Sequence, residues 1–205
     1  MAVDFKHRKT KTGNDYFPTY HALTKLLMDN IKLDPDKTIL EPCAGSGDIS
    51  IIINQCFENS IYSMDIEPRN KNIIQKDFLK YKKKFDYIIT NPPYNIFKQF
   101  YEHSLKVFTN GMYLLLPLDY LHSKERFELM YNSDKILKKV FIFVRRPLFN
   151  KKYKSSGLMP TGALTFAWFY FEKNYIGKTS IEWLDNSMYM GVPTPADQLE
   201  FKDIR

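Results

Sequence analysis

The sequence contains little cysteine and no long hydrophobic run, and each absence excludes a class of protein. Its two cysteines, Cys43 and Cys56, have no metal-ligand spacing, so we expect reduced thiols in a cytoplasmic chain. The four histidines share no spacing either, so the sequence predicts no metal site. No apolar stretch approaches the roughly 20 residues that a membrane-spanning helix needs, and residues 1–9 lack a secretory-signal core. The sequence therefore predicts no membrane association.

The charge of the chain is biased towards lysine and arginine. The formal net charge is +7 at pH 7, and basic clusters occur at 7–11, 80–84 and 145–154. Basic patches attract phosphate backbones because binding releases condensed counterions. The charge predicts a nucleic-acid partner, although lysines that only solvate the surface would give the same count.

Strand and helix patterns alternate along the 205 residues, which indicates a doubly wound α/β fold in a single domain over 1–205. Helices are expected over 20–31, 49–57 and 97–108, with a short one around 127–130. Strands are expected over 38–43, 61–65, 73–75, 85–90, 112–116, 140–144 and 164–171, with an edge strand over 181–184. Residues 1–15 are expected to form a flexible basic arm and 186–205 an irregular tail. Both tryptophans, Trp168 and Trp183, are expected in the core.

Several expected strands end in residues typical of a nucleotide site. The first strand runs into the glycine turn 44–48, and a helix follows without a gap. Glycines let the backbone approach a ligand closely, and the helix N-terminus presents unpaired N–H groups. Asp65 ends the next strand about 20 residues after Gly45, the offset at which nucleotide folds place an acid on ribose hydroxyls. Because Asp77 and Asn91 also follow strands, we expect all of these residues to meet at one crevice.

The stretch from Phe85 to Tyr94 combines a buried strand with an unusual end. Residues 85–90 are an apolar run rich in β-formers, and Asn91-Pro92-Pro93-Tyr94 follows directly. Prolines cannot donate to a sheet ladder, so the strand stops there and leaves the amide of Asn91 at its tip. Two acceptors beside the flat ring of Tyr94 would suit a planar amino group. A proline turn with a packed tyrosine is the simpler alternative.

From Tyr16 to about Lys173 the sequence resembles the class I S-adenosylmethionine-dependent methyltransferases of the Asn-Pro-Pro-Tyr type, which modify the N6 amino group of adenine in DNA. The resemblance extends to small phage and prophage members. It implies a Rossmann-like, mostly parallel seven-stranded sheet, S-adenosylmethionine as the cofactor, and a bacterial or phage-encoded chain. The cofactor-binding residues that it implies are Tyr16, Phe17, Thr19, Glu41, Ala44, Gly45, Gly47, Asp65, Asp77, Phe78 and Asn91. The N-terminal motif Tyr16-Phe17-Pro18-Thr19 departs from the family in having Pro-Thr where Thr-Pro is usual.

We expect Asn91, Pro92 and Tyr94 to be the catalytic residues. The Asn91 side-chain oxygen and the Pro92 carbonyl would accept hydrogen bonds from the adenine amino group, so that its lone pair points at the sulfonium methyl. Tyr94 would stack on the target base, and the resemblance places Phe166 on an aromatic strand near that base. A basic loop would hold substrate phosphates, or would only solvate a connection, through Lys151, Lys152 and Lys154.

The main prediction is therefore methylation of adenine in DNA, and several alternatives stay open. The same chemistry on RNA, methylation of glutamine in protein, or a catalytically silent nucleic-acid-binding subunit would each use a similar chain. A dinucleotide-binding enzyme fits less well, because its third glycine is replaced by Ser50. The sheet consumes nearly all residues, so no separate target-recognition domain is expected. Sequence choice would then come from loops, from a homodimer, or from a partner subunit.

Overall fold

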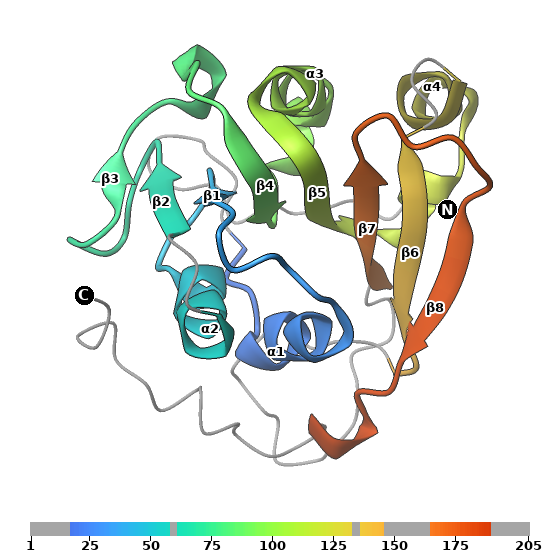
Figure 1. The fold of residues 1–205 in the computed structure, drawn as a ribbon, viewed down its shortest axis with the longest axis horizontal. Helices are drawn as coiled ribbons and strands as arrows, with labels where there is room; N and C mark the ends of the chain where they lie inside the picture. Colours follow the sequence, from blue (N-terminus) through green and yellow to red (C-terminus); the bar gives the residue numbers. More distant parts are fainter. Residues whose placement is uncertain (1–16, 58–60, 133–135, 146–164, 190–205) are drawn as a thin grey trace.

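The computed structural model of the chain describes residues 17–57, 61–132, 136–145 and 165–189, which form one twisted sheet with helices on both faces (Figure 1). The strands are β1 (Ile39–Glu41), β2 (Ile61–Asp65), β3 (Ile74–Gln75), β4 (Phe85–Thr90), β5 (Phe108–Pro117), β6 (Leu137–Phe143), β7 (Phe166–Glu172) and β8 (Ser180–Leu184). Their order across the sheet is β3-β2-β1-β4-β5-β7-β6-β8. The order reverses next to β1, so the carboxyl ends of β1, β2 and β4 meet at a switch point where open α/β sheets bind ligands.

The sheet has eight strands within the described residues, one more than the seven that the family resemblance predicts. The extra strand is β8, which pairs in parallel with β6 and forms the edge expected over 181–184. The only antiparallel partners in the described sheet are those of β7, which runs against β5 and β6. The sheet is therefore mostly parallel, as predicted. Trp183 on this edge is 65% exposed, so its expected place in the core is wrong, whereas Trp168 is fully buried.

Helices α1 (His21–Asn30) and α2 (Asp48–Cys56) cover one face of the sheet, and α3 (Phe97–Val107) and α4 (Lys124–Phe127) lie on the other face (Figure 1). Consecutive residues in a strand point to opposite faces, so both faces need apolar side chains. In β4, Ile89 packs in the cluster that includes residues of α1 and α2, and Ile88 packs in the cluster that includes residues of α3. Burial on both faces holds the strand ends in fixed positions. No helix in the described ranges is long and apolar enough to cross a membrane.

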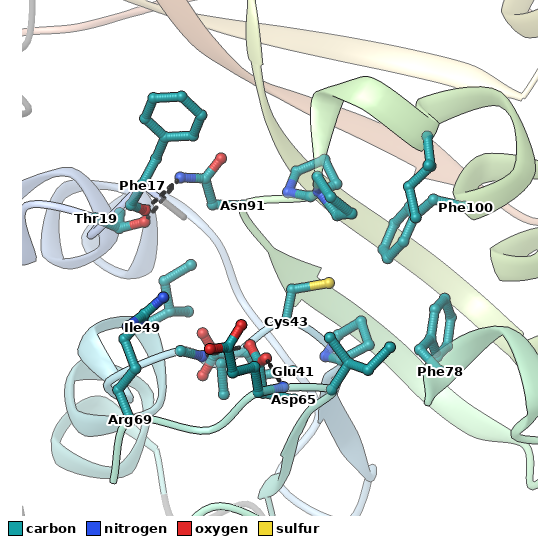
Figure 2. A pocket seen from close by; sticks show the side chains of 18 of the residues that line it. Phe17, Thr19, Glu41, Cys43, Ile49, Asp65, Arg69, Phe78, Asn91 and Phe100 are labelled. Atoms are coloured by element: carbon teal, nitrogen blue, oxygen red, sulfur yellow. Dashed lines mark hydrogen bonds between the residues drawn. The ribbon is translucent and has the colours of Figure 1, made fainter. Parts of the chain in front are cut away.

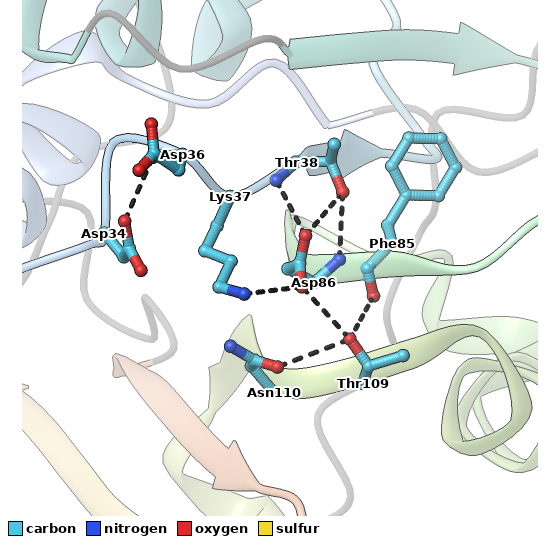
Figure 3. A network of polar contacts seen from close by, with 8 residues as sticks. All are labelled: Asp34, Asp36, Lys37, Thr38, Phe85, Asp86, Thr109 and Asn110. Atoms are coloured by element: carbon cyan, nitrogen blue, oxygen red, sulfur yellow. Dashed lines mark hydrogen bonds and ion pairs between the residues drawn. The ribbon is translucent and has the colours of Figure 1, made fainter.

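The amino ends of β1, β4 and β5 are joined by a polar network around Asp86 (Figure 3). Asp86 Oδ2 accepts from the Thr38 N–H and from Thr38 Oγ1, both at 2.9 Å, and Lys37 Nζ lies 3.7 Å from Asp86 Oδ1. Partial burial would raise the pKa of Asp86, but the Thr38 hydrogen bonds and Lys37 lower it below its usual value. This network fixes the amino ends of these strands, at the opposite end of the strands from the switch point.

Candidate functional site

A pocket of about 230 Å³ lies at the carboxyl ends of β1, β2 and β4 (Figure 2). Many of the residues predicted from the sequence line it, namely Phe17, Thr19, Glu41, Ala44, Gly45, Asp65, Asp77, Phe78, Asn91 and Pro92. Gly47 precedes the first residue of α2 next to this lining. The predicted residues Tyr16, Lys151, Lys152 and Lys154 lie outside the described part of the chain. The structure thus brings together residues that are spread over more than 70 positions of sequence, from Phe17 to Pro92.

The turn between β1 and α2 adopts a backbone conformation that favours glycine. Gly45 has φ 53° and Gly47 has φ 91°, values that residues with a Cβ atom rarely adopt. The Ala44 N–H donates to the Met64 carbonyl at 3.0 Å, which holds the turn against β2. Because α2 begins at Asp48, directly after this turn, the positive end of a helix of 9 residues lies beside the pocket.

Asp65, at the end of β2, ties the glycine turn to the second strand. Its Oδ2 accepts from the Gly45 N–H at 2.8 Å, and its Oδ1 accepts from the Glu67 N–H at 2.7 Å. A carboxylate has about four lone-pair sites, so each oxygen keeps a further site for a ligand hydroxyl. Asp65 therefore has the geometry to anchor the turn and to accept from a ribose at the same time.

Asp77 and Phe78 reach the pocket through a short 3₁₀ turn, η1 (Phe78–Lys80), that the sequence patterns do not predict. Asp77 Oδ1 accepts from the Leu79 N–H at 3.0 Å, which caps this turn. Phe78 is buried, and its ring centroid lies 5.0 Å from that of Phe100. The turn therefore places a carboxylate and an aromatic ring next to each other in the sequence at the pocket, and their contacts with an adenine ring stay a prediction.

The amide of Asn91 is held by two acceptors from the segment before α1. Its Nδ2 donates to the Phe17 carbonyl and to Thr19 Oγ1, both at 3.2 Å (Figure 2). Its Oδ1 accepts from the Tyr94 hydroxyl, which also lies 3.2 Å from the Leu115 carbonyl. The mechanism expected from the sequence leaves Oδ1 open to a substrate amino group. In the structure the Tyr94 hydroxyl holds that place.

The ring of Tyr94 is half-buried among other aromatic rings. Its centroid lies 5.7 Å from that of Phe17, 6.1 Å from that of Phe166 and 6.3 Å from that of Tyr120. The two aromatic residues predicted to meet the target base, Tyr94 and Phe166, are therefore neighbours. Phe166 itself is only 8% exposed and supports Tyr94 from β7. The roles of both residues toward a substrate stay predictions.

The pocket is acidic. Asp48, Asp65, Glu67 and Asp77 are the acidic side chains of its lining besides the buried Glu41, whereas Arg69 is the basic side chain among the described residues of the lining. Opposite charges within a few ångströms attract strongly where the surroundings are partly dry. The pocket therefore favours a ligand that carries positive charge.

Glu41 lies deepest in this acidic group and is 1% exposed. Its Oε2 accepts from Ser50 Oγ, which in turn lies 2.5 Å from Ser63 Oγ. Burial raises the pKa of Glu41 well above its usual range, and the charge of Asp48 adds to this, while the Ser50 hydrogen bond opposes it. Glu41 is thus harder to ionise than a free carboxyl, and through Ser50 it joins the end of β1 to α2.

We expect Glu41→Gln to change how the stability of the protein depends on pH. A carboxyl whose pKa is raised by folding contributes stability that is complete below its unfolded pKa of about 4.3 and is lost as pH rises through the folded pKa. The variant lacks this loss, so its free energy of unfolding should gain on the wild type as pH increases. Urea unfolding at several pH values from 5 to 8 measures the difference, with the exposed Glu102→Gln as the control that should follow the wild type. A constant difference between Glu41→Gln and wild type at all pH values would contradict the expectation.

Sequence patterns miss several residues that the structure places in the lining. Ile66, which directly follows Asp65, is 51% exposed at the pocket, and Phe100 enters from α3 behind Phe78. Arg69 is held near the glycine turn because its N–H donates to the Gly45 carbonyl at 2.8 Å. The signal in the sequence that could have identified Ile66 is an apolar residue directly after the acid that ends a strand. Arg69 and Phe100 carry no such signal.

Comparison with known proteins identifies relatives of this arrangement. No protein-family model matches the sequence. The type II methyltransferase M.AccI of Acinetobacter calcoaceticus is 31% identical over an alignment of 151 residues, which covers 59% of this chain and 27% of that protein. The chain thus spans about a quarter of the length of this relative.

Solved structures resemble the fold at low sequence identity. A modification subunit of a candidate type I restriction enzyme from Vibrio vulnificus has a TM-score of 0.58 at 13% identity, over 80% of this chain and 45% of that one. A candidate class I S-adenosylmethionine-dependent methyltransferase from Listeria monocytogenes has a TM-score of 0.58 at 13% identity, over 90% of this chain and 67% of that one. A candidate RNA methyltransferase from Pyrococcus horikoshii has a TM-score of 0.59 at 12% identity, over 82% of this chain and 92% of that one.

These comparisons agree with the motifs. The chain has the Rossmann-like α/β fold of the class I methyltransferases, a class that uses S-adenosylmethionine. The type II methyltransferase relative confirms the resemblance that the glycine motif and Asn91 to Tyr94 indicate.

Proposed function

We propose that this chain, a class I methyltransferase by its fold and by its relative M.AccI, transfers a methyl group from S-adenosylmethionine to the exocyclic amino group of adenine in DNA. The observation that carries the proposal is the position of Asn91. Its amide follows the end of β4 in the lining of the acidic pocket, and its Oδ1 is turned away from the Phe17 carbonyl. An acceptor fixed beside a pocket for a cationic cofactor is what methyl transfer to an amino group requires.

The residues of the pocket fit S-adenosylmethionine. The remaining lone pairs of Asp65 would accept from the ribose hydroxyls, while Phe78 and Ile66 provide apolar surface and Asp77 a carboxylate for the adenine ring. The acidic lining matches the positive sulfonium. When bound, this cofactor supplies an electrophilic methyl group on that sulfonium. The glycine turn leaves room for the backbone to approach it closely.

The catalytic work of the chain is to bind and orient the acceptor nitrogen. Asn91 Oδ1 and the Pro92 carbonyl would each accept one hydrogen of the amino group, so that the nitrogen lone pair turns away from the aromatic ring. Positive charge grows on that nitrogen during transfer, and the two fixed acceptors then bind it more strongly than before. The Tyr94 hydroxyl donates to the same Oδ1, so the substrate amino group has to replace it there. Movement of Tyr94 would free its ring to stack on the base, which is worth about 1–3 kcal/mol.

Two observations support nucleic acid as the substrate. The net charge of +7 suits a polyanion, and the relative at 31% identity is a type II methyltransferase. In duplex DNA the adenine would be rotated out of the stack, at a cost of a few kcal/mol. The basic segment with Lys151, Lys152 and Lys154, which lies outside the described residues, is proposed to hold the backbone phosphates. RNA is the second candidate, because one structure with the same fold is a candidate RNA methyltransferase.

We propose that the choice of a DNA sequence comes from outside the described sheet and helices. The described residues are taken up by the sheet, its helices and short connections, and we propose that residues 1–205 form a single methyltransferase domain. A partner subunit or a second copy would then supply sequence choice. One structure of the same fold is itself a modification subunit of a candidate restriction enzyme.

The proposal is tested by giving the full chain S-adenosylmethionine with a labelled methyl group together with duplex DNA, single-stranded DNA, RNA or a protein pool. The products are then digested and analysed by mass spectrometry. We expect label in N6-methyldeoxyadenosine. Label in N6-methyladenosine from RNA alone, or in methylglutamine, would replace DNA as the substrate. Cofactor binding without label in any pool would indicate a silent subunit.

A further inference from the structure

An amide side chain has two ends of nearly the same shape, and only one of them serves the proposed reaction. Asn91 has to present its oxygen to the substrate, because the target amino group donates its hydrogens. If the amide were rotated by half a turn, an NH₂ group would face another NH₂ group and no hydrogen bond would form. Something in the protein therefore has to fix which end of the Asn91 amide faces the substrate.

The segment before α1 has this effect. The Phe17 carbonyl can only accept hydrogen bonds, and it lies 3.2 Å from Asn91 Nδ2. In the rotated amide an oxygen would face that carbonyl, and two acceptors would repel each other. Thr19 Oγ1 accepts from the same Nδ2 at 3.2 Å. A hydroxyl can donate as well as accept, so Thr19 holds the amide in place while the Phe17 carbonyl selects the end. Oδ1 is then directed to the other side, where it meets the Tyr94 hydroxyl.

This segment is itself held in place by buried contacts. Thr19 is only 6% exposed, and α1 follows two residues later with His21 at 5%. His21 Nε2 lies 3.1 Å from Asp48 Oδ1, which joins α1 to the start of α2 beside the glycine turn. The indole N–H of Trp168 donates to the Leu23 carbonyl at 3.0 Å, which joins α1 to the sheet. The position of Thr19 is therefore tied to both the cofactor turn and the core.

We propose that Thr19 is a positioning residue for methyl transfer, which acts by holding the Asn91 amide in the orientation that the Phe17 carbonyl selects. The proposal rests on the proposed function of Asn91 and goes beyond the cofactor contact expected of Thr19 from the sequence. The Thr19 hydroxyl and the Phe17 carbonyl together hold the NH₂ end, and the loss of the hydroxyl leaves this end with one partner, the Phe17 carbonyl. Thr19 would thus influence kcat rather than cofactor affinity.

The test compares Thr19→Val, which removes the hydroxyl and keeps the shape, with Thr19→Ser, which keeps the hydroxyl. We expect Thr19→Val to lower kcat about 5- to 30-fold, the loss typical of one removed hydrogen-bond partner, and Thr19→Ser to stay within about threefold of wild type. The Kd for S-adenosylmethionine, from calorimetry, should change less than about threefold in both. Thr24→Val is the matched control, since Thr24 is also buried on α1 and its Oγ1 has no hydrogen-bond partner within the described residues. It should keep the wild-type kcat.

A readout without turnover separates this proposal from the proposed function. The side-chain NH₂ signals of Asn91, assigned by their loss in Asn91→Ala, should move upfield in the ¹⁵N–¹H spectrum of Thr19→Val and return in Thr19→Ser. If the wild type transfers no methyl group, the proposed function fails while these signals still report on the amide. Should Thr19→Val unfold, Thr19→Ala takes its place. An unchanged kcat with unchanged Asn91 signals, or a weaker cofactor Kd at unchanged kcat, would overturn the proposal.

Discussion

Asn91→Ala is expected to lower kcat for methyl transfer by about 10²–10³-fold while the Kd for S-adenosylmethionine changes less than about threefold. The reason is that Asn91 Oδ1 would meet the acceptor nitrogen, whose charge develops only during the reaction. The Asn91 side chain lies on the rim of the pocket and bonds to Phe17, Thr19 and Tyr94. Its removal therefore takes away one acceptor of the transition state and leaves the glycine turn and Asp65 in place. Single-turnover kinetics with saturating cofactor, together with calorimetric titration, measure the two quantities.

The control for this variant is Asn110→Ala, at the opposite end of the strands from the pocket. Asn110 lies beside Thr109 near the amino end of β5, in the network around Asp86 (Figure 3). The same chemical change there should leave both kcat and the cofactor Kd close to the wild-type values. If Asn91→Ala retained the wild-type single-turnover rate, the acceptor role of the Asn91 amide would be wrong. If Asn91→Ala bound S-adenosylmethionine much more weakly than the wild type, the main role of Asn91 would be to bind the cofactor.

Reasoning from sequence succeeded where one residue type has one physical use. The glycine turn needs φ values that Gly45 and Gly47 adopt at little cost, and two prolines after Asn91 end β4 because they cannot donate to the sheet. The carboxyl ends of neighbouring parallel strands share one edge of the sheet, so Asp65 and Asn91 had to approach each other. These local rules were enough to predict the fold class and to place Gly45, Asp65, Asp77 and Asn91 in one pocket, whereas the other predicted residues of the lining came from the family resemblance.

Local rules could not predict which partner each side chain would choose. The bond between Thr19 and Asn91 joins residues 72 positions apart, and no pattern in either segment indicates it. The Tyr94 hydroxyl bonds to Asn91 Oδ1 because tertiary packing among Phe17, Phe166 and Tyr120 sets the angle of its ring. Trp183 was expected in the core, but β8 is an edge strand and leaves it exposed. These contacts depend on the assembled sheet.

Asp65→Ala is expected to have the opposite pattern to Asn91→Ala, with the main loss in cofactor affinity. Asp65 accepts from Gly45 and Glu67 N–H groups at 2.8 and 2.7 Å, and its remaining lone pairs would accept from the ribose. Hydrogen bonds to a charged group contribute about 1.5–3 kcal/mol, so the Kd for S-adenosylmethionine should rise roughly 10- to 150-fold. At saturating cofactor the single-turnover rate should recover to within about fivefold of wild type, because Asn91 is unchanged.

A weaker Kd in Asp65→Ala has two possible origins, loss of the ribose contact and loss of the glycine turn. A matched variant separates both origins from general damage to the fold. Asp86 also accepts from a backbone N–H, that of Thr38 at 2.9 Å, but it lies near the amino end of β4, away from the pocket. Asp86→Ala should lower the free energy of unfolding and leave the cofactor Kd unchanged. Titration with S-adenosylhomocysteine, which has the ribose but not the sulfonium charge, should show the same fold-loss in Asp65→Ala as S-adenosylmethionine does. A loss confined to S-adenosylmethionine would instead assign to Asp65 an electrostatic role toward the sulfonium, and an unchanged Kd for both would remove Asp65 from the cofactor site.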